Sequence, residues 1–274
     1  SFTWATHAFG PYVGWMGGWG LIAASVIVLS NLAAVAVDFT FLLLAQITGS
    51  QAIADLAGNL WVNIPLTLVY LALAGWISHR GMETTKHLQY ILVAFQILAL
   101  GAFAVAALMQ SSRGAGFDPT PVQLDWFNPF TAGDFSVVAA GVSLSIFLFW
   151  GWDVTLTMNE ETKDPERTPG RAAAVTVFVI IAVYILSALA VISWAGIGSE
   201  GLGAGNPDNQ ESIFAVLAGP ILGPFAVIMS SAILVSSLAS LQSTMVSPAR
   251  TLLAMGFYRA VPARFAEPVS YTHL

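Results

Sequence analysis

The sequence contains no cysteine and very little charge. Among its 274 residues are 9 Lys and Arg and 15 Asp and Glu, so charged residues make up 9 % and hydrophobic residues 57 %. The absence of cysteine excludes disulfides, thiolate metal sites and CxxC redox chemistry. An ordinary soluble domain carries about 25 % charged residues. A soluble enzyme, a nucleic-acid-binding protein and a disordered tail are therefore excluded.

The charges are also missing from long continuous stretches, which predicts membrane-spanning helices. Uncharged runs extend over 1–37, 56–79, 88–112, 172–199 and 212–249. We predict six membrane helices in one transmembrane domain: 19–46, 60–78, 88–109, 134–159, 172–195 and 221–247. The fold class is therefore an all-α, polytopic helical bundle in the lipid bilayer.

The basic residues predict which way these helices cross. Eight of the nine lie in alternate connections, namely loops 79–87 and 160–171 and the tail after 247, and the ninth is Arg113. The positive-inside rule makes those three segments cytoplasmic, so both ends of the chain are expected in the cytoplasm.

Aromatic and capping residues mark the predicted helix ends. Tryptophans near these ends are typical of an interfacial aromatic belt: Trp15, Trp19, Trp61, Trp76, Trp126 and Trp194. Thr131 and Asp134 have capping-box spacing before the fourth span. At the start of the fifth span, Thr168 is predicted as the N-cap residue and Pro169 as the first helical residue.

Two acidic residues, Asp38 and Asp153, fall within predicted spans. A charge at bilayer depth costs roughly 2.5–3.5 kcal/mol or more, so each must face a cavity, a partner or the interface. Asp38 lies near the end of its span, where reaching the outer interface is an equal alternative. Asp153 follows Gly151, which is flanked by tryptophans. This pattern favours a broken helix lining a cavity, and a straight helix with one packing glycine is the alternative.

Three stretches resemble the amino acid–polyamine–organocation (APC) superfamily. FWGWDVTLTMNEETKDPERTPGRA is similar to the family's sixth helix and following loop, carried by Gly151, Asp153, Glu160, Glu161, Pro165, Pro169 and Ala172. FGPYVGWMGGW resembles the approach to the third helix. PARTLLAMGFYRAVPARF resembles the segment after the eighth, carried by Arg250, Ala254, Pro262 and Phe265. The resemblance covers helices three to eight of about twelve, so we expect a fragment.

The resemblance implies two inverted five-helix repeats, a 5+5 leucine-transporter-like fold, with substrate bound between broken first and sixth helices. Gly10-Pro11-Tyr12 and Gly223-Pro224-Phe225 precede the two spans that would be symmetry mates.

The resemblance also implies site residues. Phe147 matches an aromatic gate, Trp150 and Gly151 match the unwound segment that meets the substrate's amino group, and Asp153 matches a coupling position. Asn31 matches a substrate contact on helix three, with an interhelical hydrogen bond as an equal alternative. Thr244 and Gln242 lie on the face of helix eight that approaches the site.

Some family features are missing. The first helix is absent, and the fifth-helix stretch has no lysine, so lysine-based coupling is not supported. Ser236, Ser237 and Ser240 are more typical of close helix packing than of sodium ligands. The terminal EPVSYTHL departs from the family pattern, and whether it is native stays open.

The expected function is secondary active transport of amino acids or related amines across the cytoplasmic membrane by alternating access. The alternatives are a polyamine, nucleobase or organic-acid carrier on the same fold, and a non-transporting membrane protein. We expect no enzymatic activity, catalytic residue, metal or cofactor. Proton, sodium and exchange coupling, the particular substrate and the oligomeric state stay open.

Overall fold

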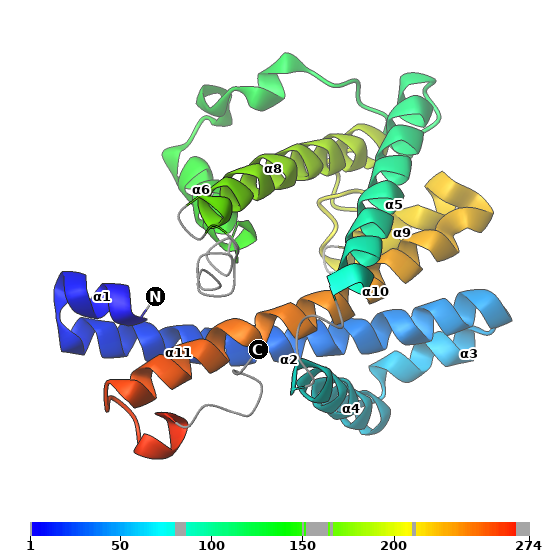
Figure 1. The fold of residues 1–274 in the computed structure, drawn as a ribbon. Coiled ribbons are helices and arrows are strands. Elements are labelled where there is room, and N and C mark those ends of the chain that lie inside the picture. The colour runs from blue at the N-terminus through cyan, green and yellow to red at the C-terminus, as the bar shows by residue number, and fades with distance from the viewer. Residues whose placement is uncertain are drawn as a thin grey trace. The chain divides into compact units, whose positions relative to one another are not determined.

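The computed structural model describes residues 2–79, 86–149, 151, 164, 167–209 and 212–266, and all secondary structure in these ranges is helical (Figure 1). The chain divides into two units. Unit 1 comprises 1–96 and 230–274, and unit 2 comprises 97–229. Helices α5 (Lys86–Ser112) and α10 (Ala226–Thr244) each contribute residues to both units.

Unit 1 is built on the long helix α2 (Pro11–Thr48). The other elements of unit 1, besides its parts of α5 and α10, are α1 (Phe2–Phe9), α3 (Gln51–Ala54), η1 (Asp55–Gly58), α4 (Leu60–His79), α11 (Val246–Phe257) and η8 (Ala263–Ala266). Gly10, with φ of 90°, separates α1 from α2, and Pro11 opens α2 where no backbone donor is needed. Gly49 ends α2 in the left-handed conformation and donates its N–H to Ala45 O at 2.8 Å.

Two contacts hold unit 1 together. Ala33 of α2, Ala74 of α4 and Leu241 of α10 form a buried cluster, because small residues let helix backbones approach closely. Near the start of α2, Gly14 is buried against Thr6 of α1, and Gly18 is buried against Met255 of α11 and Phe2 of α1. A Cβ at Gly14 would lie 2.9 Å from Thr6 Cα, so only glycine leaves room for α1.

Unit 2 contains the end of α5 and the start of α10. Its remaining elements are η3 (Leu124–Phe127), η4 (Pro129–Ala132), α6 (Phe135–Leu148), α8 (Thr168–Ala195), η6 (Pro207–Asn209), α9 (Ile213–Leu222) and η7 (Gly223–Phe225). The hydroxyls of Ser111 on α5 and Ser193 on α8 lie 2.7 Å apart and are both buried. The backbone N–H of Thr120 donates to Ser193 O at 2.9 Å, so the loop after α5 packs onto the end of α8.

The interpretation of Trp194 as an interfacial belt residue is wrong. Its side chain is only 4 % exposed, and its carbonyl accepts N–H bonds from Phe117 at 2.9 Å and Asp118 at 3.3 Å. Gly116 permits this approach, because a Cβ there would lie 2.5 Å from Trp194 O. A tryptophan at a helix end is thus covered by a loop of its own unit and does not face lipid.

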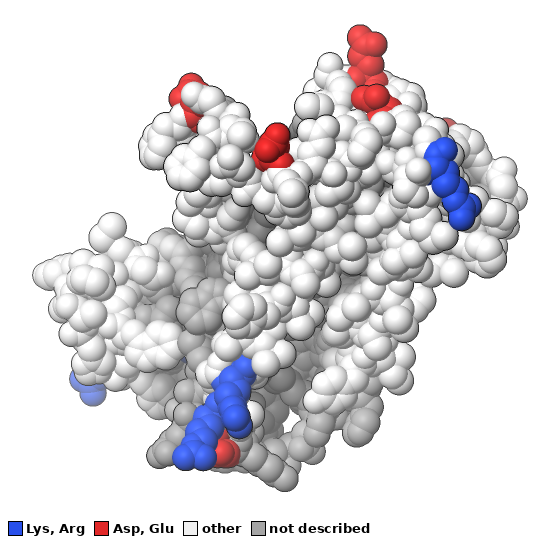
Figure 2. All heavy atoms as spheres, turned by 90° about the horizontal axis from the view of Figure 1, so that it is seen from above, with Lys and Arg blue, Asp and Glu red and all other residues white. Residues whose placement is uncertain are grey.

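Within the described residues, five helical segments are long and apolar enough to cross a membrane: Pro11–Thr48, Leu60–Ser78, Gln89–Ser112, Thr168–Ala195 and Ile213–Phe257. A shorter apolar helical stretch covers Phe135–Ile146. The visible described surface in Figure 2 is mostly uncharged, with acidic and basic side chains in small separate groups. These features are those of a multi-pass membrane protein.

Three of the helical regions begin four or more residues before their predicted start or are divided. The helix α8 begins at Thr168, four residues before the predicted 172. The first predicted span, 19–46, lies inside a helix that starts eight residues earlier, at Pro11. The last, 221–247, is not one helix. The α9 helix ends at Leu222, Gly223 has φ of 56°, and helical structure continues through η7, α10 and α11 to Phe257. Proline at 224 following a glycine with positive φ explains the interruption.

The capping interpretations also need correction. Asp134 itself caps α6, because its Oδ1 accepts the Ser136 N–H at 3.0 Å, whereas the Thr131 hydroxyl donates to Asn128 O at 2.7 Å. Arg167 occupies the N-cap position of α8, so Thr168 is already the first helical residue.

Candidate functional site at the end of α6

The predicted break in the fourth span lies just beyond the end of α6. This helix has 14 residues and ends at Leu148, and Gly151 has φ of 114°, a conformation that side-chain-bearing residues rarely adopt. At 1.5 Å per residue α6 is about 21 Å long, shorter than the roughly 30 Å hydrocarbon core. A helix of this length that begins at the membrane surface ends within the core.

The end of α6 presents backbone carbonyl groups. A helix leaves its last four carbonyls without intrahelical donors, and they give that end a partial negative charge. The Phe149 N–H satisfies Ser145 O at 3.0 Å, and the Tyr184 hydroxyl donates to Leu148 O at 3.0 Å. Such an end is chemically suited to attract a cationic ammonium group.

Several residues predicted for the site belong to this region. Phe147 lies in the last turn of α6, and Gly151 lies beyond its end. Trp150 and Asp153, with the whole stretch 152–163, lie outside the described residues. Their roles stay predictions.

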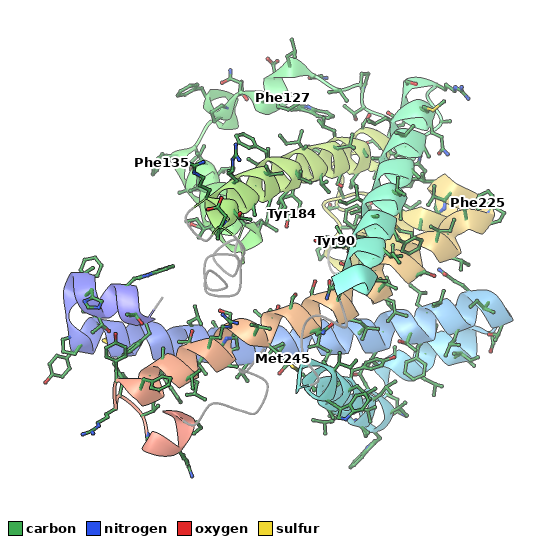
Figure 3. The ribbon with its side chains drawn as sticks, viewed as in Figure 1. Tyr90, Phe127, Phe135, Tyr184, Phe225 and Met245 are labelled. Atoms are coloured by element: carbon green, nitrogen blue, oxygen red, sulfur yellow. The ribbon has the colours of Figure 1, made fainter. Side chains whose placement is uncertain are left out.

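Tyr184 is a residue of this region that sequence reasoning missed. It lies on α8 (Figure 3). Its ring meets the ring of Phe149 edge-on, at a centroid distance of 5.7 Å and an interplanar angle of 76°. A tyrosine far from both ends of an apolar helix was the available signal, because its hydroxyl needs a partner at that depth.

Asn31 lies on an exposed face of α2. Two residues along a helix turn the side-chain direction by about 200°, so Asn31 lies on the opposite face from buried Ala33. Asp38 follows Asn31 by about two full turns and lies on the same face. Asp38 is held by Asn63 of α4, whose Nδ2 donates to Asp38 Oδ1 at 3.0 Å and to Ala57 O at 2.9 Å. Asp38 therefore has a hydrogen-bonding partner within unit 1.

Thr244 is the last residue of α10 and is half-buried. Its neighbour Gln242 accepts a 3.4 Å hydrogen bond from Gln89 of α5. Asn31 and Thr244 belong to unit 1, and Phe147 and Gly151 belong to unit 2. The structure therefore describes Asn31 and Thr244 separately from Phe147 and Gly151.

Among the described residues, no group of three or more His, Asp or Glu side chains is placed to hold a metal ion. The chemistry on offer around α6 comes from backbone carbonyls, hydroxyls and aromatic rings.

A comparison with models of known protein families identifies the family to which this chain belongs. The model of the amino acid permease family matches residues 1–273. The chain belongs to the amino acid permease family. This confirms the resemblance that the motifs around Gly151 indicated.

Individual relatives agree with that assignment. The chain is 22 % identical over 253 residues to the large neutral amino acids transporter small subunit 2 of Oryctolagus cuniculus, covering 92 % of this chain and 44 % of the relative. It is 25 % identical over 205 residues to a branched-chain amino acid permease of Lactococcus lactis, covering 70 % and 41 %. An uncharacterized transporter of Mycobacterium tuberculosis is 28 % identical over 262 residues, covering 96 % and 52 %. The chain thus spans about half the length of the curated relatives it matches.

Proposed function

We propose that the chain is part of a secondary active permease that carries amino acids or related amines across the cytoplasmic membrane by alternating access. The observation that carries this proposal is the end of α6 at Leu148, followed by Gly151 at φ of 114°. Broken helices at membrane depth are where many secondary transporters bind substrate. Family membership and the transporter names of the relatives support the same function.

In this proposal the substrate's amino group meets the carbonyls of Trp150 and Gly151. The negative end of the α6 dipole favours an ammonium group there, and Phe147 in the last turn supplies an aromatic gate. Asp153 couples transport or holds the broken helix. Asn31 and Thr244 complete the substrate site, and loops 79–87 and 160–171 and both chain ends lie in the cytoplasm.

The 5+5 repeat is part of the proposal, and a local similarity supports it. Gly10 follows the 8-residue helix α1 and Gly223 follows the 10-residue helix α9, and both have positive φ, of 90° and 56°. In each case a proline is the next residue and opens the following helix. The two junctions thus share a Gly-Pro sequence and a glycine with positive φ.

Substitution of Gly151 tests the proposal. Gly151→Ala forces a side chain into φ of 114°, and such strain costs about 1–3 kcal/mol, so we expect at least a fivefold loss of radiolabelled amino acid uptake in proteoliposomes of the native protein. Gly141→Ala is the matched control, because Gly141 lies within α6 with no neighbouring atom within 4 Å of an added Cβ. Equal uptake by the two variants would exclude the break from the mechanism.

Two further measurements separate the alternatives. Asp153→Ala is expected to abolish uptake while the protein still reaches the membrane, and unchanged uptake would remove Asp153 from the mechanism. In a competition panel, failure of every amino acid to compete would favour a polyamine, nucleobase or organic-acid carrier. Absence of any substrate-dependent flux would favour a non-transporting membrane protein.

A further inference from the structure

Tyr184 contacts the end of α6 at two points, both within unit 2. Its hydroxyl donates to the carbonyl of Leu148 at 3.0 Å, and its ring packs edge-on against Phe149. The contact joins residues 36 positions apart in the chain. Figure 3 shows Tyr184 on α8 beside α6.

This hydrogen bond lies far from both ends of α8. Tyr184 lies about 24 Å along α8 from Thr168, away from both ends of the 28-residue helix. Tyrosines are enriched at membrane interfaces, where water satisfies the hydroxyl. A hydroxyl midway along a helix that is long and apolar enough to span a membrane needs a partner within the protein, and Leu148 O is that partner.

The same contact supplies a donor to one of the last carbonyls of α6. Ser145 O is already taken by the Phe149 N–H, and Leu148 O is taken by Tyr184. Two of the last four carbonyls of α6 thus have donors of their own, before the backbone continues toward Gly151. The contact with Phe149 fixes the first residue after the helix, from which that backbone continues.

We infer that Tyr184 is a positioning residue for the substrate site. It holds the end of α6, from which the backbone continues toward Gly151 and the proposed site for the amino group. The inference rests on the proposed function, because it assigns a role within the same site.

The test compares two tyrosine-to-phenylalanine variants of the native protein. Tyr184→Phe keeps the ring and removes the hydroxyl that binds Leu148. Tyr70→Phe is the matched control, since its hydroxyl bonds Thr40 at 2.7 Å between α2 and α4 in unit 1. Each variant loses one tyrosine hydrogen bond between two apolar helices. A general loss of stability should therefore be similar in Tyr184→Phe and Tyr70→Phe.

Uptake kinetics separate positioning from stability. We expect Tyr184→Phe to raise the KM for the transported amino acid about three- to tenfold, the range that one lost hydrogen bond supports, with a smaller change in maximal rate. Tyr70→Phe should leave KM within twofold. An unchanged KM in Tyr184→Phe, or an equal rise in both variants, would overturn the inference.

A second measurement does not depend on transport. A spin label at Leu144→Cys, one turn before Leu148, should become more mobile in Tyr184→Phe and not in Tyr70→Phe. If the native protein takes up no amino acid, the proposed function fails, and the label decides the positioning role alone. Unchanged mobility would then refute it, and increased mobility would support it.

Discussion

The indole N–H of Trp194 donates a hydrogen bond to Oε1 of Gln110 at 2.9 Å. The amide of Gln110 in turn donates to Ile221 O at 2.8 Å, so one side chain joins α5, α8 and α9 inside unit 2. The nitrogen and the oxygen of this amide are each bonded to a partner more than 80 residues away in sequence. A polar residue in an apolar helix thus organises the packing of three helices.

Replacement of Gln110 should lower the stability of the native permease. Gln110→Leu leaves the buried indole N–H of Trp194 and the carbonyl of Ile221 without their partner, at a cost of about 1–3 kcal/mol for each unsatisfied group. Thermal unfolding in detergent measures the effect. Gln123→Leu, at an exposed glutamine in the loop after α5, is the control, and equal melting temperatures for the two variants would contradict the role of Gln110.

The packing of α1 on α2 should depend on Gly14 and not on Gly17. A Cβ at Gly14 would lie 2.9 Å from the backbone Cα of Thr6, whereas one at Gly17 would lie 4.0 Å from Ala5 Cβ. Overpacking of this kind costs about 1–3 kcal/mol, so Gly14→Ala should unfold at lower temperature. Gly17→Ala should match the native protein or exceed it, because alanine favours helix. The reverse order would refute the contact.

Acid should weaken the start of α6 through Asp134. The backbone N–H of Ser136, and then its hydroxyl, hold the pKa of the Asp134 carboxyl below its ordinary value of 3.8. A lowered pKa in the folded state means that the stabilisation is complete above the unfolded-state pKa and is lost as pH falls through the folded-state pKa. The native protein should therefore lose more thermal stability between pH 5 and about pH 3 than Asp134→Asn, which caps without titrating. Parallel pH profiles would exclude this contribution.

Cysteine labelling tests the proposed orientation, and the chain offers a background without cysteine. In a native protein otherwise free of cysteine, a membrane-impermeant maleimide should label Gln123→Cys in intact cells. Thr84→Cys, in loop 79–87, should react only after the membrane is opened, because its loop carries basic residues. Labelling of Thr84→Cys first would invert the topology.

The helix regions and the family could be anticipated from the sequence, but helix junctions could not always be. Leu60–His79 and Lys86–Ser112 begin and end within three residues of the predicted 60–78 and 88–109, because hydropathy changes sharply there. The last region was predicted as a single helix, since every residue near Gly223 is apolar. Its interruption depends on backbone conformation at Gly223 and on Pro224, which hydropathy does not measure.

One feature of the candidate site, the helix end near Gly151, was anticipated. The pattern around Gly151 pointed to a helix end, and α6 ends three residues earlier. The partners of that end could not be foreseen, because the position of Tyr184 shows only that its hydroxyl needs a partner, not that Leu148 O supplies it. Trp194 illustrates the same limit, since an aromatic residue at a helix end faces either lipid or a covering loop.

The sequence by itself determined that this protein is a multi-pass member of the amino acid permease family. Scarcity of charge and a run of motif residues are properties of the chain that do not depend on packing. Only the tertiary structure decided which residues meet: Thr6 with Gly14, Gln110 with Trp194, and Tyr184 with Leu148. The physical reason is that in an apolar environment each polar group or close approach needs one particular partner, and the path of the chain selects it.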